Sequence, residues 1–113
     1  MTTSEIATVL AWHDALNERD VDTLISLSSD DIEVGDANGA VQGHNALADW
    51  ARSIDITGEP GRMYVRDGVV VVEHTVGAWA FRVVRDHVTS VFRHGDLGSA
   101  LAATDLTEQD LDA

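Results

Sequence analysis

Apolar residues recur at helical spacing over the first part of the chain. The repeat predicts a first helix that opens with a capping box of Thr2 and Glu5 and ends at about Glu18. Its apolar positions are Ile6, Val9, Leu10, Trp12, His13 and Leu16. Asp20 is placed to cap a second, shorter helix, which the polar stretch 28–31 ends. The apolar side of this second helix consists of Val21, Leu24, Ile25 and Leu27.

A hairpin and a third helix are predicted next. Ile32 and Val34 alternate with polar residues, which indicates a strand that reaches the pair Asn38–Gly39. This pair is a strong hairpin signal, because both positions of a tight primed turn need positive φ. The return strand is expected at 40–42, and Gly43 precedes the helix. The apolar positions of that helix are Leu47, Trp50, Ala51 and Ile54.

The second half of the chain alternates as strands do. The predicted strands are 63–65, 69–72, 74–84 and 88–94, and the turn signals between them are Asp67–Gly68 and the weaker Arg85–Asp86. In the last strand, alternation places Arg93 on one face with Thr89 and Val91. The other face carries Val88, Ser90, Phe92 and His94.

A short helix is predicted to close the chain. Asp96 is its cap, and its apolar residues are Leu97, Leu101 and Ala102, with Leu106 and Leu111 adding a final turn. The order of elements predicts one α+β domain over residues 1–113, with helices on one face of a curved antiparallel sheet. A chain of 113 residues agrees with a single domain.

The charge of the chain excludes some partners. Twenty acidic residues stand against seven basic ones, all arginine, for a formal net charge of −13. Such a surface repels phosphate backbones and anionic lipids, so we expect neither nucleic acid nor a membrane as partner. Cysteine is absent, which excludes disulfides and thiolate chemistry. With no signal peptide or membrane-spanning run in the sequence, a cytoplasmic location is expected.

The residues in this order resemble the nuclear transport factor 2-like superfamily, and within it the SnoaL-like branch of polyketide cyclases and ketosteroid isomerases. The resemblance extends roughly from Ser4 to Leu106. It is carried by 15–24 (ALNERDVDTL), 29–34 (SDDIEV), Gly39, Gly43, 46–50 (ALADW) and 91–97 (VFRHGDL). It implies a cone-shaped barrel, a cavity between the helices and the concave face of the sheet, and a homodimer formed through the outer face.

The resemblance also implies site residues. Asp36 stands where the isomerase branch has its catalytic base. Trp12 stands where that branch has a tyrosine that donates to the oxyanion, and Trp79 falls at about the position of a second acid. An indole N–H is a single, weakly acidic donor, so strong enolate stabilisation is not expected. Epoxide hydrolases of the superfamily have Arg and Asp two residues apart on a strand, and no predicted strand here has this pattern.

Asp36 and Arg93 are the charged candidates. If Asp36 faces an apolar cavity, burial makes it a competent base; otherwise it is a residue favoured beside a tight turn. Arg93 either points into the barrel, where it pairs with Asp36 or holds a substrate carboxylate, or is solvated at the open end.

Aromatic residues and histidines are the remaining candidates. Trp12, Trp79 and Phe81 are expected to wall a pocket for a planar apolar ligand, whereas Trp50 is more typical of core packing. His13 either edges the pocket or ends in water beside Asn17. The histidines lack the spacing of metal ligands, so no metal site is expected. Without a glycine-rich phosphate loop, no nucleotide cofactor is expected either.

Two functions stay open at this point. In the first, the protein binds an apolar, carbonyl-bearing small molecule and acts without a cofactor as an isomerase, cyclase or dehydratase, with Asp36 as general base. In the second, it is a non-catalytic ligand-binding or dimerisation module whose cavity is filled by side chains. An open cavity with a buried ionisable group would favour the enzyme, and a packed interior with Asp36 at the surface would favour the module.

Overall fold

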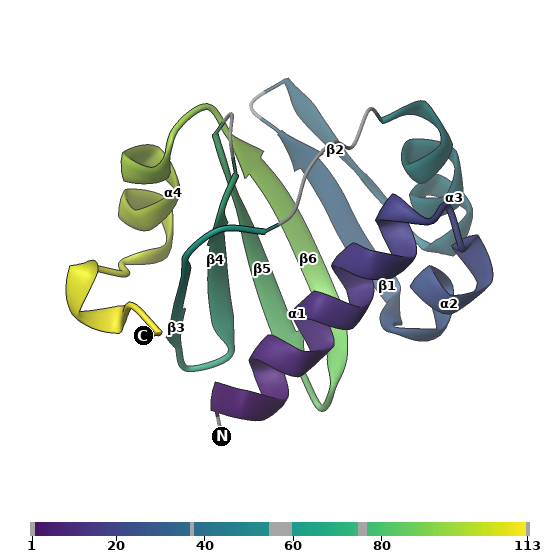
Figure 1. Ribbon diagram of the computed structural model, residues 1–113. Helices are drawn as coiled ribbons and strands as arrows, with labels where there is room; N and C mark the ends of the chain where they lie inside the picture. Colours follow the sequence, from purple (N-terminus) through teal and green to yellow (C-terminus); the bar gives the residue numbers. More distant parts are fainter. Residues whose placement is uncertain (1, 37, 55–59, 75–76, 113) are drawn as a thin grey trace.

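The computed structural model describes residues 2–36, 38–54, 60–74 and 77–112, with side chains from residue 5 onward (Figure 1). Its helices are α1 (Thr2–Asn17), α2 (Val21–Ser26), α3 (His44–Ser53) and α4 (Leu97–Thr104), followed by the short 3₁₀ helix η1 (Glu108–Asp110). Its strands are β1 (Ser28–Asp36), β2 (Gly39–Gln42), β3 (Met63–Arg66), β4 (Val69–Glu73), β5 (Ala78–Val84) and β6 (His87–His94). The α+β prediction is confirmed.

The six strands form one open sheet in the order β2-β1-β6-β5-β4-β3. Neighbours are antiparallel except β1 and β6, which run parallel, so the prediction of a wholly antiparallel sheet is wrong at this pair. A parallel pair needs a long crossover connection, and here the crossover includes α3 and the three strands β3 to β5. The sheet is curved with β2 and β3 as its edges, so it does not close into a complete barrel.

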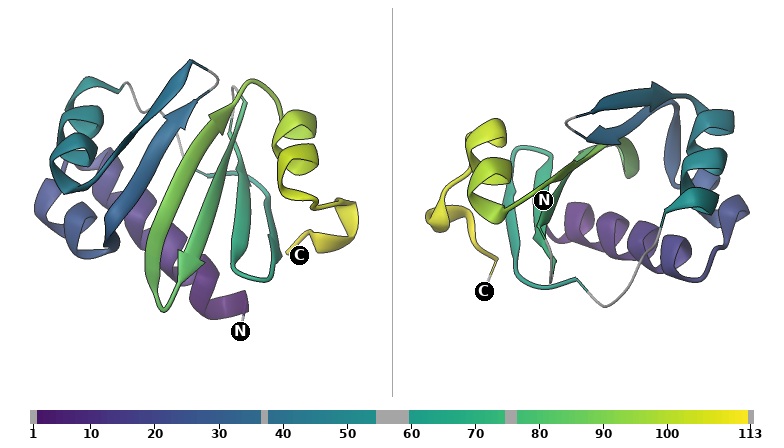
Figure 2. Two further views of the ribbon diagram at one scale, coloured as in Figure 1. Left: turned by 180° about the vertical axis from the view of Figure 1, so that it is seen from behind. Right: turned by 90° about the horizontal axis from the view of Figure 1, so that it is seen from above.

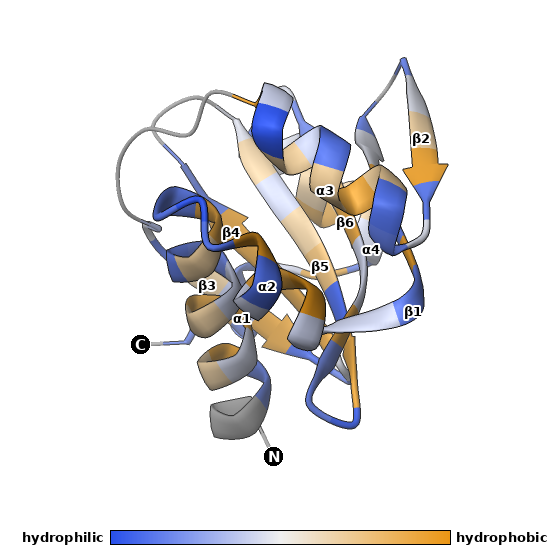
Figure 3. Cartoon of the chain, turned by 90° about the vertical axis from the view of Figure 1, so that its right-hand side faces the viewer, coloured by the Kyte–Doolittle hydropathy of each residue, from blue (hydrophilic) through white to orange (hydrophobic). Residues whose placement is uncertain are grey.

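Helices cover both faces of the sheet, not one face as predicted (Figure 2). The face covered by α1, α2 and α3, here called the inner face, holds the larger core, which includes Trp12, Leu47 and Phe81. The opposite, outer face is partly covered by α4, which encloses a second core that includes Tyr64, Ala100 and Leu106. Strands β3 to β5 are apolar at consecutive positions, as Figure 3 shows by colour, because they are buried on both faces.

Several local predictions are confirmed. Asp20 caps α2 by accepting from the backbone N–H of Thr23, and Asp96 caps α4 in the same way through Ser99. The turns Asp67–Gly68 and Arg85–Asp86 have positive φ at both positions, as a primed hairpin turn requires. The predicted capping box at the N-terminus lies outside the described residues, because the side chain of Thr2 is not described.

Three boundaries differ from the prediction. Strand β1 begins at Ser28 instead of Ile32, because Ser28 pairs with Val88 of β6, a contact far away in the sequence. Strand β5 begins at Ala78, so His74 is outside the strand in which it was predicted. The ladder of the first hairpin ends with the pair Asp36 and Gly39, so Gly39 is a strand residue and not a turn position.

The faces of β6 also differ near its start. Val88 was predicted to face away from Val91, yet both residues belong to the inner core. The ladder with β5 pairs Arg82 with Ser90 but Val83 with Val88, which leaves Thr89 as an extra residue. This β-bulge reverses the alternation, so Val88 returns to the inner face. The predicted faces of Arg93, Phe92 and His94 beyond the bulge are confirmed by their pairing with β5.

The second core predicts a stability difference between two leucines. Leu106 is 5% exposed in the outer core, whereas Leu10 is 39% exposed on α1. We expect Leu106→Ala to lower the free energy of unfolding by about 2–4 kcal/mol, since it removes buried methyl groups and leaves a cavity. Leu10→Ala, the matched control, should change it by less than about 1 kcal/mol. Urea unfolding measures both, and equal effects would contradict a structural role for the outer core.

Candidate functional site

Aromatic side chains gather on the inner face between α1, α3 and β5. The ring of Trp12 meets Phe81 edge to face at a centroid distance of 5.4 Å, and Trp50 meets Trp79 in the same way at 5.9 Å. These contacts come from three elements that are far apart in the sequence. They make a continuous apolar wall, of which Trp50 is only partly buried and the other three rings are buried.

The polar group of Trp12 is already engaged. The side chain is fully buried, and its Nε1–H donates to the hydroxyl of Ser28 at 2.9 Å. That hydroxyl in turn donates to the carbonyl oxygen of Leu24 at 2.7 Å. Because an indole has a single N–H donor, Trp12 has none left for a ligand. Trp12 therefore contributes an apolar ring, and not the weak hydrogen-bond donor that was predicted.

Two histidines lie at one side of this aromatic wall. His13 on α1 is buried, and its ring centroid is 5.0 Å from that of His74, which follows β4. His74 stacks on Trp79 at 4.8 Å with an interplanar angle of 23°. Within the described part of the chain, neither Nε2 atom has a hydrogen-bond partner. His13 is buried, so it does not end in water, although it does lie beside Asn17, whose amide is 3.2 Å from its Nδ1.

Both imidazoles are held in the neutral form. Burial, and secondarily the neighbouring His13, lowers the pKa of His74 from 6.5 to about 4. Burial also lowers the pKa of His13, although the nearby Asp14 acts in the opposite direction. A charged imidazolium among apolar rings loses its hydration, which is the physical cause in both cases. At neutral pH the two rings are therefore uncharged.

Asp36 and Arg93 form an ion pair at the end of the sheet. The Oδ2 atom of Asp36 lies 3.8 Å from Nη2 of Arg93, and each side chain is 38% exposed. Asp36 Oδ1 also accepts from the backbone N–H of Asn38 at 2.8 Å. The structure thus combines two alternatives from the sequence, because Asp36 both stabilises the turn and pairs with Arg93. Its side chain is not enclosed in an apolar cavity. Because the rings of Trp12, Trp79 and Phe81 pack the interior, the inner face meets the condition given for the non-catalytic module and not the one given for the enzyme.

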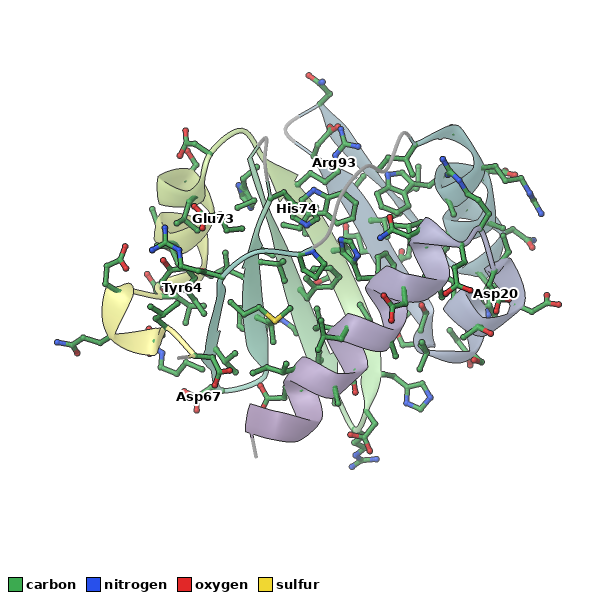
Figure 4. All side chains as sticks on the ribbon, in the orientation of Figure 1. Asp20, Tyr64, Asp67, Glu73, His74 and Arg93 are labelled. Carbon is green, nitrogen blue, oxygen red and sulfur yellow. The ribbon has the colours of Figure 1, made fainter. Side chains whose placement is uncertain are left out.

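Trp79 connects the ion pair with the histidines. It is paired with Arg93 across the β5–β6 ladder, so their side chains leave the sheet on the same face. The ring of Trp79 also stacks with the ring of His74. Figure 4 shows Arg93 and His74 at the same end of the molecule.

A separate cleft opens on the outer face, between α4 and strands β5 and β6. Its volume is about 500 Å³, within the range of small-molecule sites. Arg82, Phe92 and Thr104 are among its lining residues, and so are Asp36 and Arg93. The structure therefore divides the predicted site residues. Trp12, His13 and Trp79 lie in the inner aromatic cluster, Asp36 and Arg93 line the outer cleft, and Phe81 contributes to both.

Sequence reasoning missed His74, Asn17 and Ser28 as parts of this arrangement. His74 was interpreted as one residue of a long strand, and nothing in its local pattern indicates that it stacks on Trp79. Its contact with His13 depends on α1 crossing the sheet over β4 and β5. Among the described residues, no group of three or more histidine, aspartate or glutamate side chains is placed to hold a metal ion.

This architecture, helices packed against a curved sheet that surrounds an aromatic interior, defines a nuclear transport factor 2-like protein. A family model described as a SnoaL-like domain matches residues 9–99, and the chain belongs to that family. A search of curated proteins found no match. None of the described helices has the length and apolar character needed to cross a membrane.

Solved structures share the fold. An NTF2-like protein of Burkholderia xenovorans is 22% identical, with a TM-score of 0.71 over 92% of this chain and 98% of that one. An LEH-like epoxide hydrolase of M. tuberculosis is 19% identical, with a TM-score of 0.70 over 89% of each chain. A ketosteroid isomerase-like protein of Kribbella flavida is 16% identical, with a TM-score of 0.69 over 81% of this chain and 77% of that one. At these identities the likeness establishes the fold alone.

The lowered pKa of His74 predicts a loss of stability in mild acid. Between pH 6.5 and about 4 the unfolded chain binds a proton at His74 that the folded protein does not, so stability falls as the pH is lowered through this range. The contribution to the slope is at most about 1.4 kcal/mol per pH unit for one histidine. We expect His74→Phe, which keeps an aromatic ring against Trp79, to reduce this loss.

The measurement is the free energy of unfolding by urea at intervals between pH 7 and pH 4.5. His87→Phe is the matched control, because His87 is exposed at the start of β6. The control should keep the pH dependence of the parent. If parent, His74→Phe and His87→Phe have the same slope, burial does not hold His74 neutral.

Proposed function

We propose that the protein binds an apolar small molecule with a carbonyl group in the cleft between α4, β5 and β6 and transfers a proton on it, with Asp36 as the proton acceptor. The observation that carries this proposal is the Asp36–Arg93 ion pair, because both residues line this cleft. A carboxylate that lines a cleft together with Ala80 and Phe92 is placed to meet the C–H next to a carbonyl group. No cofactor is needed for this chemistry.

The roles of the residues follow from their chemistry. The carboxylate of Asp36 takes a proton from the carbon next to the carbonyl, the electron pair of the C–H bond moves into the enolate, and the proton returns at the same or a conjugated carbon. Arg93 orients the carboxylate and raises the local positive potential. Ala80 and Phe92 supply apolar surface to the cleft that holds the ligand.

The fold relatives support this reaction class without establishing it. The family and the ketosteroid isomerase-like neighbour are consistent with small-molecule chemistry in a cofactor-free site. The epoxide hydrolase-like neighbour shows that the same fold accommodates other reactions. Function in such a widely used fold has to be argued from the site, so the arrangement of Asp36 and Arg93 in the cleft is given the greater weight.

Deuterium exchange tests the proposal without knowledge of the natural substrate. 2-Acetylnaphthalene is a planar apolar ketone whose methyl protons are next to the carbonyl. We expect the protein to accelerate their replacement by deuterium in D₂O over buffer alone, and Asp36→Asn to lower that rate by about 100-fold, as for loss of a general base. Proton NMR of the ketone measures the rates.

Asp31→Asn is the matched control, since Asp31 is an exposed acid on the same strand. It should exchange the ketone at the parent rate. An Asp36→Asn protein that is folded and as fast as the parent would contradict the role of Asp36. A parent that binds the ketone but does not exchange it would favour the non-catalytic alternative.

Dimerisation is the second candidate function, and the outer face favours it. The part of this face that α4 leaves open contains the cleft lined by Phe92, and Val84 nearby on β5 is 50% exposed. We propose that a second copy of the chain covers this region. This region includes the cleft lined by Asp36 and Arg93, so a ligand bound there would lie within the dimer interface.

Light scattering coupled to gel filtration tests the dimer. The parent should have about twice the chain mass of 12.2 kDa. Phe92→Arg should shift it to the monomer mass, since it places a further positive charge beside Arg82 in the covered region. Val41→Arg, on the exposed edge strand β2, is the control and should leave the mass unchanged. A monomeric parent at micromolar concentration would contradict the dimer.

A further inference from the structure

Arg82 is a charged residue of the outer cleft that the proposed reaction does not use. It is exposed on β5 and lines the cleft, and its guanidinium forms no ion pair with any acid that the structure describes. Arg93 in the same cleft is paired with Asp36 at 3.8 Å. Among the described residues that line the cleft, two arginines therefore stand against one acid, and the charge of Arg82 is not offset.

The charge of the whole chain makes such a cation unusual. The sequence has seven basic residues and 20 acidic ones, for a net charge of −13. Arg52, Arg62 and Arg66 each lie within ion-pair distance of an acid at the surface. A cleft with low-dielectric walls focuses the field of the charges that line it, so an uncompensated arginine there attracts an anion. Arg82 supplies the positive charge that an anionic group would need against the overall repulsion.

Arg82 and the Asp36–Arg93 pair lie at different positions along the cleft. The β5–β6 ladder pairs Arg82 with Ser90, and Arg93 is three residues further along β6. At about 3.3 Å per residue, this is a separation of about 10 Å along the strand. Ala80 and Phe92 pair with each other between these two positions, and both line the cleft. A ligand that spans the cleft would have one functional group at each end and an apolar body between them.

The surroundings of Arg82 suit a carboxylate. Arg82 and Ser90 are a cross-strand pair, so their side chains leave the sheet on the same face. This is the outer face, because Ala80, two residues before Arg82, belongs to the outer core. A guanidinium presents two parallel N–H groups that match the two oxygens of a carboxylate, and a serine hydroxyl is a further donor. Across the next ladder Ser90 faces Glu33, an exposed acid that is not among the residues lining the cleft.

We propose that Arg82 binds a carboxylate of the ligand, with Ser90 as a second donor, and that the ligand is an apolar keto acid that extends along the cleft from Arg82 to Asp36. This inference rests on the proposed function and adds the substrate class to it. The carboxylate of the ligand stays ionised and takes no part in the proton transfer. It orients the ligand, so that the carbon next to the carbonyl group lies at Asp36.

A charged and an uncharged ligand of nearly the same shape test the assignment. 6-Acetyl-2-naphthoic acid, ionised at neutral pH, carries a ketone and a carboxylate at opposite ends of a flat ring system, and its methyl ester lacks the charge. In about 0.1 M salt, which screens charges further than about 10 Å away, we expect the parent to bind the acid about tenfold more tightly than the ester. Arg82→Gln should abolish this preference by weakening binding of the acid only. Isothermal titration calorimetry gives the dissociation constants.

Two other arginines provide matched controls. Arg85 lies in the turn after β5, is exposed, and is not among the residues lining the cleft, so Arg85→Gln should keep the preference. Arg93 is already paired with Asp36, so Arg93→Gln should keep most of it. Arg82→Lys retains the charge without the planar fork and should keep part of it. Equal losses in the three glutamine variants, or a preference that depends on Arg93 alone, would overturn the proposal.

Nitrogen-15 NMR tests the contact itself. The Nε–H signal of Arg82, assigned by its absence in Arg82→Gln, should shift when the acid is added and stay in place when the ester is added. Ser90→Ala should weaken binding of the acid by a smaller factor than Arg82→Gln does, since it removes a neutral donor and not a charge. An Nε–H signal that does not respond to the acid, although the acid binds more tightly than the ester, would overturn the assignment to Arg82.

Failure of this inference differs from failure of the proposed function. Where the parent exchanges the acetyl protons of the acid, Arg82→Gln should raise KM and leave kcat nearly unchanged, because Arg82 binds the ligand away from the reacting carbon. Exchange that depends on Asp36, with the same KM in the parent and Arg82→Gln, overturns only the inference. A preference for the acid that depends on Arg82, with no exchange in the parent, overturns the catalytic role of Asp36 and leaves the carboxylate site in place. A parent that binds neither the acid nor the ester overturns both.

Discussion

The first strand, β1, lies between its hairpin partner β2 and the last strand, β6, and it runs parallel to β6. Much of the site depends on this pairing. It joins the two ends of the fold, aligns Val34 with Val91, and so brings Asp36 to Arg93 at the ends of the two strands. It also holds α2 and α3, which precede and follow the first hairpin, over the inner face. Without this pairing of β1 with β6, the side chains of Asp36 and Arg93 would not lie beside each other.

The inner face combines a closed apolar core with polar side chains that differ in how far their hydrogen bonds are satisfied. Ser28 binds the indole of Trp12 and a backbone carbonyl, so it is a structural residue whose hydrogen bonds are satisfied. His13 and His74 have a lowered pKa, and their Nε2 atoms have no hydrogen-bond partner among the residues that the structure describes. In a low-dielectric interior, satisfied polar groups add rigidity and unsatisfied ones cost stability.

Arginine is scarce in this acidic chain, and most of its copies bind defined partners. Arg19 donates to the carbonyl of Ala51, and Arg66 donates to that of Asp105. Arg62 pairs with Glu73 at 2.9 Å, which connects the segment before β3 to the end of β4. The Arg19 contact is partly buried and the other two are exposed, and an exposed ion pair such as Arg62–Glu73 adds little to stability. They nevertheless link segments that the hydrophobic core alone does not fix, as the Arg93–Asp36 pair does at the site.

The sequence by itself determined the local elements, since caps, primed turns and helical periodicity act within a few residues. Asp20, Asp96 and Asp67–Gly68 were predictable for this reason. It also indicated the family fold, and it offered the pairing of Arg93 with Asp36 as one of the alternatives for Arg93. It missed the parallel pairing, the bulge beside Thr89 and the placement of α4, because each depends on contacts between distant segments.

Tertiary structure decided the chemistry of the individual side chains. The N–H of Trp12 donates to Ser28, so it is not available to another acceptor. His74 stacks on Trp79, a contact that no local sequence pattern indicates. His13 was ambiguous in the sequence, because a residue at the border of a helical apolar face can turn to either side. The crossing of α1 over the sheet decided that it is buried and neutral, since burial is a property of packing and not of sequence position.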